Sequence, residues 1–195
     1  MSKRMIKNYI ESGNNLRNSL TEQSEVILAI ADAIIQAFQN DKKMIIFGNG
    51  GSAADAQHIC SEFVSGFFSG GVPLPAIALT TNSSCLTAIA NDDGYENVFI
   101  RQLQSLARQG DIVIGISTSG NSVNVLKALK EAAKIGAVTV IFTGERNKFK
   151  QQISYIISVP AKESSLVQEA HITAGHLLCY LVGDTYVKRK RSKKL

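Results

Sequence analysis

Tryptophan is absent from this chain of 195 residues, and aromatic side chains make up only 7% of it. Small aliphatic residues are plentiful instead, a balance that favours a sheet covered by helices over a β-sandwich. No apolar run approaches the ~18 residues of a membrane span. The N-terminus leads into a polar, amphipathic segment and not into the apolar core of a signal peptide. We therefore expect a cytoplasmic protein whose length suits one domain with its own core.

Cysteine pairs with the spacing of a zinc finger or a disulfide framework are also missing. The three cysteines, Cys60, Cys85 and Cys179, are widely spaced, odd in number and set in helical or apolar surroundings. We expect packed, reduced thiols at all three positions.

A basic surface is not implied by the net charge of +5, because six cations are confined to the last residues: Lys188, Arg189, Lys190, Arg191, Lys193 and Lys194. Without those six the rest of the chain carries a charge of −1. We expect residues 188–195 to be a solvated, disordered tail. Binding of nucleic acid or an anionic membrane by this tail is the disfavoured alternative.

Two helical patterns open the chain, at residues 6–18 and 20–40. The letters Ser19-Leu20-Thr21-Glu22 have the spacing of a capping box, which predicts the start of the second helix. We expect the first helix to be used in assembly, because apolar helices without partners would leave a large exposed patch.

Strand and helix patterns alternate after residue 42. Five short apolar runs are typical of parallel strands covered on both faces: residues 43–47, 75–79, 111–116, 137–143 and 155–159. Helical patterns lie at residues 52–68, 97–108, 122–135 and 164–187. This order predicts an α/β fold with a doubly wound, five-stranded parallel sheet, in one domain that spans residues 1–187 with the N-terminal helices included.

Ser, Thr, Asn and Gly crowd the segments that follow four consecutive strands: residues 49–52, 80–84, 117–122 and 143–145. Ligands of such sheets bind beyond the carboxyl ends of the strands. One such loop would be ordinary turn chemistry, but several on the same edge predict a cleft lined by hydroxyls and amides.

The turn Gly48-Asn49-Gly50-Gly51-Ser52 joins an apolar run to a helix that carries His58 and Glu62. Its backbone N–H groups and helix N-terminus suit an anionic or polyhydroxylated ligand. His58 and Glu62 share one helix face and could ligate a metal or move protons together. The alternative is a surface turn followed by a polar helix stripe.

The segment Ser117-Thr118-Ser119-Gly120-Asn121-Ser122 is the best candidate for phosphate binding, because it follows one strand and opens the next helix. The sequence has no GxxxxGK[ST], which disfavours a nucleoside triphosphate, and this loop lacks GxGxxG, which weakens a dinucleotide hypothesis. The alternative is an N-capped helix start with surplus hydroxyls.

Two further polar residues lie on the last helical pattern. Gln168 and His176 are eight residues apart and can converge on one site, whereas His171 points about 140° away from His176. His58 and His176 are the candidate acid–base pair. For either histidine alone, a satisfied core or surface position remains the alternative.

Four phrases together resemble the sedoheptulose-7-phosphate isomerases, a family of single sugar-isomerase (SIS) domains. They begin at Gly48 (GNGGSAADAQH), Thr87 (TAIAND), Gly110 (GDIVIGISTSGNS) and Gln168 (QEAHITAGH). The chain departs from the family at Ser65-Gly66-Phe67, where many members have Gly-Arg-Phe, and at Ser165-Leu166, where an Asp-Arg pair is common.

The resemblance implies an aldose–ketose isomerase that interconverts sedoheptulose 7-phosphate and D-glycero-D-manno-heptose 7-phosphate through an enediol-type state. That step opens bacterial heptose synthesis for surface glycans such as lipopolysaccharide. Glu62 would be the base and His176 its partner acid/base. The resemblance also implies a homotetramer with interface active sites and one zinc per subunit, held by His58, Glu62, Gln168 and His176.

Positions that match the family's substrate contacts are Asn49, Gly50, Gly51, Ser52, Glu62, Asn91, Asp92, Ser117, Thr118, Ser119, Ser122 and Gln168. A non-catalytic SIS module, such as one that associates with the bacterial replication initiator, is the alternative. The presence of Glu62 and His176 favours the enzyme.

Overall fold

The computed structural model describes residues 2–145 and 153–192. Its centre is a five-stranded sheet in the order β2-β1-β3-β4-β5, in which every pair of neighbours is parallel. The strands are β1 (Met44–Gly48), β2 (Ala76–Ala78), β3 (Ile112–Ser117), β4 (Val138–Thr143) and β5 (Tyr155–Ser158). The predicted α/β class and all five predicted strands are therefore confirmed.

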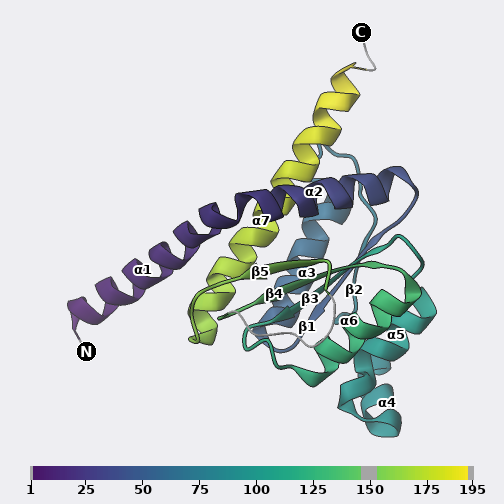
Figure 1. Cartoon of the computed structure of the whole chain (residues 1–195), viewed down its shortest axis with the longest axis horizontal. Coiled ribbons are helices and arrows are strands. Elements are labelled where there is room, and N and C mark those ends of the chain that lie inside the picture. The colour runs from purple at the N-terminus through teal and green to yellow at the C-terminus, as the bar shows by residue number, and fades with distance from the viewer. Residues whose placement is uncertain (1, 146–152, 193–195) are drawn as a thin grey trace.

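Helices cover both faces of the sheet (Figure 1). They are α1 (Lys3–Asn18), α2 (Ser24–Gln39), α3 (Gly51–Ser65), α4 (Ser83–Asp93), α5 (Val98–Leu106), α6 (Val123–Ile135) and α7 (Ser164–Ser192). Helices α2, α3 and α7 share one apolar cluster with the sheet, and α5 and α6 share a second. Helix α1 extends away from the body of the molecule (Figure 1). Within the described part of the chain, no helix is both long and apolar enough to cross a membrane.

Strand β1 shows why these strands lack polar alternation. Met44 and Ile46 belong to the cluster under α2, α3 and α7, whereas Ile45 and Phe47 belong to the cluster under α5 and α6. All four side chains are fully buried. Because successive residues of a strand face opposite sides, both faces must be apolar when both are covered.

The predicted capping box at residues 19–22 is wrong. Residues Ser19–Gln23 form a 3₁₀ helix between α1 and α2, and Ser19 has helical φ and ψ of −62° and −18°. An N-cap residue needs an extended backbone. The Ser19 hydroxyl instead donates to the carbonyl of Leu16, 2.7 Å away. A serine side chain can bond backward as well as forward, so spacing alone did not decide this position.

Helix α4 was missed by the sequence analysis, which assigned Ser83 and Ser84 to a loop. Asn82 caps the helix, since its Oδ1 accepts a hydrogen bond of 3.0 Å from the Cys85 N–H. None of the α4 residues is fully buried. Leu86, Ile89 and Ala90 do recur at helical spacing and pack on the apolar cluster of α5 and α6, but the sequence analysis read the Ser, Thr and Asn residues before them as a loop.

The ends of two other helices also differ from the predictions. Helix α3 stops at Ser65 because Gly66 takes a left-handed φ of +71°, whereas the sequence predicted residues 52–68. Helix α7 continues to Ser192, beyond the predicted end at residue 187. An ion pair of 2.6 Å between Lys188 and Asp184, four residues apart, supports this extension. The last three residues of the predicted tail, 193–195, lie outside the described residues.

Helices α3 and α7 run parallel and in close contact. A Cβ added at Gly175 would clash with the Ile59 side chain of α3, and one added at Gly183 would lie 2.5 Å from the backbone of Phe68, just after α3. Glycines on α7 thus let this helix approach both α3 and the segment that follows it closely. This contact determines which residues of α7 face the polar stripe of α3.

Candidate active site

The carboxyl ends of the strands meet at one edge of the sheet, as the sequence predicted. Gly48 pairs with Ile116, Ser117 with Thr143, and Thr143 with Ser158 in the parallel ladders. From β1 the chain passes to β2 on one side and later to β3 on the other. The ends of β1 and β3 therefore form the switch point at which sheets of this kind bind ligands.

The glycine turn after β1 leads directly into α3. Gly50 has φ +54° and ψ −123° and provides no side-chain cap, and a Cβ at this position would meet no atom within 4 Å. Gly51 is different, since a Cβ there would lie 2.5 Å from Nε2 of Gln168. The structure thus brings the predicted Gln168 onto the predicted turn, and only glycine leaves room for it.

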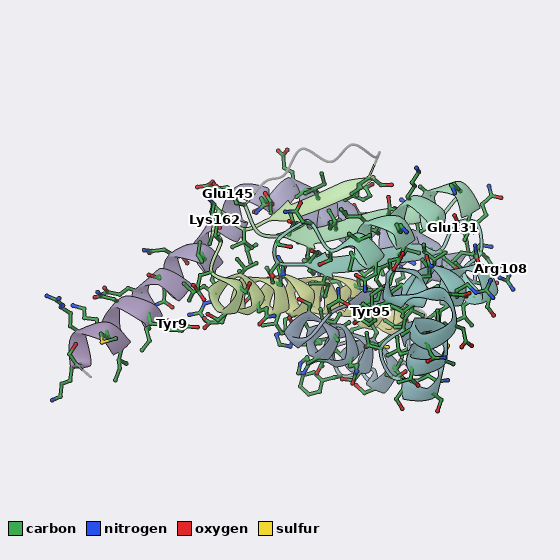
Figure 2. All side chains as sticks on the ribbon, turned by 90° about the horizontal axis from the view of Figure 1, so that it is seen from below. Tyr9, Tyr95, Arg108, Glu131, Glu145 and Lys162 are labelled. Atoms are coloured by element: carbon green, nitrogen blue, oxygen red, sulfur yellow. The ribbon has the colours of Figure 1, made fainter. Side chains whose placement is uncertain are left out.

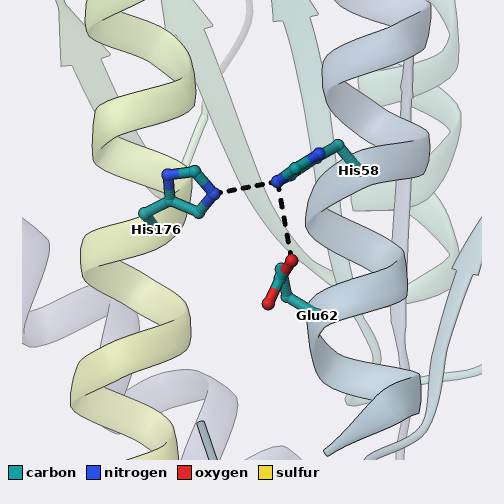
Figure 3. Close-up of side chains that lie close together, drawn as sticks. All are labelled: His58, Glu62 and His176. Carbon is teal, nitrogen blue, oxygen red and sulfur yellow. Dashed lines mark hydrogen bonds and ion pairs between the residues drawn. The ribbon is translucent and has the colours of Figure 1, made fainter. Parts of the chain in front are cut away.

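His58, Glu62 and His176 converge between α3 and α7 (Figure 3). Nε2 of His58 lies 2.9 Å from Nε2 of His176, so the N–H of one imidazole donates a hydrogen bond to the other. The same His58 nitrogen lies 3.6 Å from Oε1 of Glu62. The three candidate ligand atoms all lie within 4.8 Å of one another.

Two imidazole nitrogens and one carboxylate oxygen are a donor set that catalytic zinc sites use, with a further position open to water or substrate. His58, Glu62 and His176 therefore fit a metal by their chemistry and by their mutual distances. Gln168 is on α7, about two turns before His176, and its side chain packs against Gly51.

The surroundings of these three residues are partly apolar. The Glu62 side chain is 20% exposed, against 50% for His58. The Phe68 ring lies 6.5 Å from the His176 ring and contacts Tyr180 edge-on. Burial and, secondarily, the Glu62 charge raise the pKa of Cys179 to about 12. Cys179 therefore stays a neutral thiol beside the carboxylate, in agreement with the predicted reduced cysteines.

Asp55 is a neighbour of the site that the sequence analysis did not single out. Burial raises the pKa of Asp55 to about 6, and the nearby His58 opposes that rise. Its Oδ2 is buried without a hydrogen-bond partner among the described residues. Its position one helical turn before His58 was the available signal, because carboxylates often orient the histidines of metal sites.

The loop at residues 117–122 forms a compact set of hydroxyls at the start of α6. The Ser117 and Ser122 hydroxyl oxygens lie 2.9 Å apart. Ser119 Oγ accepts a bond of 3.2 Å from the Asn121 N–H, and Thr118 Oγ1 lies 3.3 Å from Ser164 Oγ at the start of α7. Ser122 is the N-cap residue of α6, but its side chain makes no capping bond. The alternative of an ordinary N-capped helix start is therefore weakened.

Two of the predicted residues do not join the His58–Glu62–His176 group. Asn91 and Asp92 are exposed at the end of α4, where the Asn91 amide donates to the Asp92 carboxylate at 2.8 Å. No contact links them to that group within the described residues.

His171 lies outside the site, as predicted from its position about 140° around the helix from His176. It is fully buried, and its Nε2 donates to the Thr143 carbonyl at 3.0 Å. Burial lowers the pKa of His171 to about 4, so the ring is neutral.

Comparison with known proteins assigns the chain to a family. The SIS domain family model matches residues 8–144. A phosphoheptose isomerase from Aneurinibacillus thermoaerophilus is 46% identical over 189 residues, which are 95% of this chain and 96% of that protein. One from Aquifex aeolicus is 48% identical over 85% of this chain and 87% of that protein.

Two solved structures agree with these sequences. The phosphoheptose isomerase of Neisseria gonorrhoeae superposes with a TM-score of 0.84 at 36% identity, covering 93% of this chain and 98% of its own. That of Francisella tularensis has a TM-score of 0.86 at 29% identity, covering 94% and 100%.

Proposed function

The chain belongs to the SIS-domain family of phosphoheptose isomerases and is an isomerase, and from this premise we propose that it interconverts sedoheptulose 7-phosphate and D-glycero-D-manno-heptose 7-phosphate. The observation that supports this most is the convergence of Glu62 with two histidines between α3 and α7. In bacteria this reaction would supply heptose for surface glycans.

Aldose–ketose isomerisation moves a proton between neighbouring carbons through an enediol-type state, so it needs a base, an acid and a group that stabilises the developing oxyanion. Glu62 is our proposed base, because it is the carboxylate of the group and is largely shielded from water. His176 faces it from α7 and is the proposed partner acid/base for the substrate oxygens.

His58, Glu62 and His176 are the proposed ligands of one zinc ion per subunit, with Gln168 as the fourth. Zinc would polarise a carbonyl or hydroxyl oxygen of the sugar. A carboxylate bound to a metal is a weaker base, so Glu62 would serve as ligand and as base at different stages.

The phosphate is proposed to bind at residues 117–122, where Ser117, Thr118, Ser119 and Ser122 surround the N-terminus of α6. Asn49, Gly50, Gly51, Ser52 and Gln168 would contact the sugar from the glycine turn and α7, and Asn91 and Asp92 from the end of α4. Gly66 occupies the position of the family arginine, and its φ of +71° disfavours any larger residue there. The contacts of this chain with its substrate therefore differ from those of many relatives.

We further propose a homotetramer with active sites at its interfaces. Helix α1 projects from the body, as Figure 2 shows for the turn that carries Tyr9. Its Met5, Ile6, Tyr9 and Ile10 are all exposed. An apolar stripe of this kind on a protruding helix is typical of an interface between copies. A cytoplasmic location stays a prediction.

The decisive experiment is incubation of the purified protein with sedoheptulose 7-phosphate, with and without a chelator, followed by NMR of the sugar. We expect aldoheptose signals to appear, to be lost with the chelator and to return when zinc is added. Binding of the sugar phosphate without any turnover in the zinc-loaded protein would favour the non-catalytic module instead.

A further inference from the structure

We propose that Asn124 is a positioning residue that, together with Tyr95, holds the Asn49 carboxamide in one orientation at the sugar site. The proposal rests on the proposed function only in assigning a sugar to that site. Asn49 follows β1, Asn124 lies in the first turn of α6 after β3, and Tyr95 lies in the 3₁₀ helix Tyr95–Asn97 after α4. Three segments distant in sequence thus meet at the switch point.

The two asparagines form a closed amide pair. Asn49 Nδ2 donates to Asn124 Oδ1 at 2.9 Å, and Asn124 Nδ2 donates to Asn49 Oδ1 at 2.9 Å. Tyr95 adds a third bond, since its hydroxyl donates to Asn49 Oδ1 at 3.0 Å. Asn124 is only 4% exposed, so the pair is anchored on a buried side chain.

The direction of every bond in this set follows from one backbone group. The Val125 N–H donates to Asn124 Oδ1 at 2.9 Å, which places the oxygen of the Asn124 amide on that side. Asn49 must then present its NH₂ group to this oxygen, and its own oxygen must face the Asn124 NH₂ group. An Asn49 amide turned by 180° would place donor against donor and acceptor against acceptor.

One donor of Asn49 remains for a ligand. Its oxygen accepts two hydrogen bonds, and one hydrogen of Nδ2 is donated to Asn124. Within the described part of the chain, the second hydrogen has no partner. Beside it, the exposed Tyr95 hydroxyl can still accept a hydrogen bond through its oxygen. A fixed donor next to an acceptor suits a hydroxyl group, which accepts from one and donates to the other.

Tyr95 also ties a weakly held segment to the glycine turn. Helix α4 has no fully buried residue, and it carries the proposed substrate contacts Asn91 and Asp92 near its end. The Tyr95–Asn49 bond joins the residues just after that helix to the turn after β1. The orientation of Asn49 and the placement of this segment are therefore coupled.

The test is a double-mutant cycle with Asn49→Ala, Asn124→Ala and the double variant, measured as kcat and KM for the heptose phosphate. Each single change should reduce kcat/KM by roughly tenfold, mainly through KM, because one contact shared by substrate and transition state is lost. The double variant should be no worse than Asn49→Ala, since Asn124 acts through Asn49. Multiplying effects in the double variant would overturn the proposal.

Two more conservative variants keep the proposal testable if Asn124→Ala does not fold. Asn124→Asp keeps the size of the side chain and the acceptor for the Val125 N–H, but its carboxylate cannot donate to Asn49. Tyr95→Phe removes only the hydroxyl that donates to Asn49. Both should raise KM by severalfold, whereas Tyr155→Phe, at the far edge of the sheet on β5, should leave the kinetics unchanged.

Crystal structures of the wild type and of Asn124→Asp give a readout that does not depend on turnover. We expect the Asn49 side chain to adopt the paired rotamer in the wild type and to leave it in the variant. An unchanged Asn49 rotamer would overturn the proposal even if the enzyme is active. Loss of the rotamer in a protein that does not turn over the heptose would instead support the positioning role and reject the proposed substrate.

Discussion

Glu62 is the residue whose chemistry matters most to the proposed reaction. It lies on α3 with its carboxylate 3.6 Å from His58 and with only a fifth of its side chain exposed. A carboxylate shielded in this way is better placed to take a proton from carbon than one in open water, because less water must be displaced.

Glu62→Gln should lower kcat by at least ~10²-fold with the fold retained, because it keeps size and hydrogen bonding but removes the proposed base. The measurement is the initial rate with sedoheptulose 7-phosphate, with circular dichroism as the check on folding. Glu25→Gln, an exposed change on α2, is the matched control and should leave the initial rate unchanged. Near-normal turnover by the Glu62 variant would remove this residue from the mechanism.

His171 makes stability depend on pH. Burial lowers the pKa of His171 from 6.5 to about 4, so the folded protein binds this proton more weakly than the unfolded chain. The stability is therefore fully present above pH 6.5 and is lost as the pH falls through about 4. The loss attributable to His171 should be about 3 kcal/mol.

Urea unfolding between pH 7 and pH 4 would measure this effect, with His171→Gln as the comparison. Glutamine can still donate to the Thr143 carbonyl but does not titrate. The free energy of unfolding of the His171→Gln variant should therefore fall less steeply than that of the wild type as the pH is lowered. Equal slopes for the two proteins would show that His171 is not the group responsible.

At the scale of elements, the pairing of α3 with α7 is what creates the site. Where α7 meets the segment just after α3, Gly183→Ala would place a methyl group against the backbone of Phe68, which cannot move aside easily. We expect a loss of about 1–3 kcal/mol in the free energy of unfolding. Thermal and urea unfolding would measure it.

Gly13→Ala in α1 is the control for that prediction. A Cβ at Gly13 would meet the carboxylate of Glu169, the movable end of a flexible side chain. The gain in helix propensity from glycine to alanine is up to about 1 kcal/mol, so this variant should be neutral or slightly more stable. A loss at Gly13 as large as that at Gly183 would contradict the argument from close helix contact.

The loop before α6 is the element proposed to hold the phosphate. Ser119→Ala and Ser122→Ala should each weaken substrate binding by roughly 1 kcal/mol or more, since each removes a hydrogen bond to a charged group. The loss should be much smaller with the same sugar lacking its phosphate. Equal losses with both sugars, measured by calorimetry, would place the phosphate elsewhere.

At the scale of the whole molecule, a metal would join α3 to α7, which are far apart in the chain. Because binding to the folded state raises stability, zinc should raise the melting temperature of the wild type. It should not do so for the His58→Ala/His176→Ala double variant. Differential scanning fluorimetry with and without zinc makes the comparison, and a zinc response that survives in the double variant would refute this ligand set.

Assembly can be tested at the same scale. Light scattering should give a tetramer for the wild type and a smaller species for Ile6→Glu/Ile10→Glu, which places charges on the apolar stripe of α1. If interface residues complete the site, the smaller species should also lose activity. A wild type that is monomeric in solution would end the tetramer hypothesis but would leave the fold unaffected.

Much of the architecture could be predicted because it depends on local patterns. The apolar runs of β1 and β3 and the period of α2 are properties of neighbouring residues, and they located those elements within a few positions. Helix α4 was missed because its apolar set of Leu86, Ile89 and Ala90 is short and follows a polar stretch that is equally typical of a loop, while the Asn82 cap is seen only in the structure. The capping box predicted at Ser19 was wrong because a serine hydroxyl can bond either forward or backward along the chain. In the structure it bonds backward, to the Leu16 carbonyl.

The sequence by itself determined the fold class, the family and the helix face that carries His58 and Glu62, since these depend on composition, order and helical period. Only the tertiary structure brought His176 to within 2.9 Å of His58, Gln168 onto Gly51, and Asn124 against Asn49. Each of these contacts joins residues distant in the chain. Their geometry follows from how closely α3 packs on α7 and from the order of the strands, neither of which is encoded in any single segment.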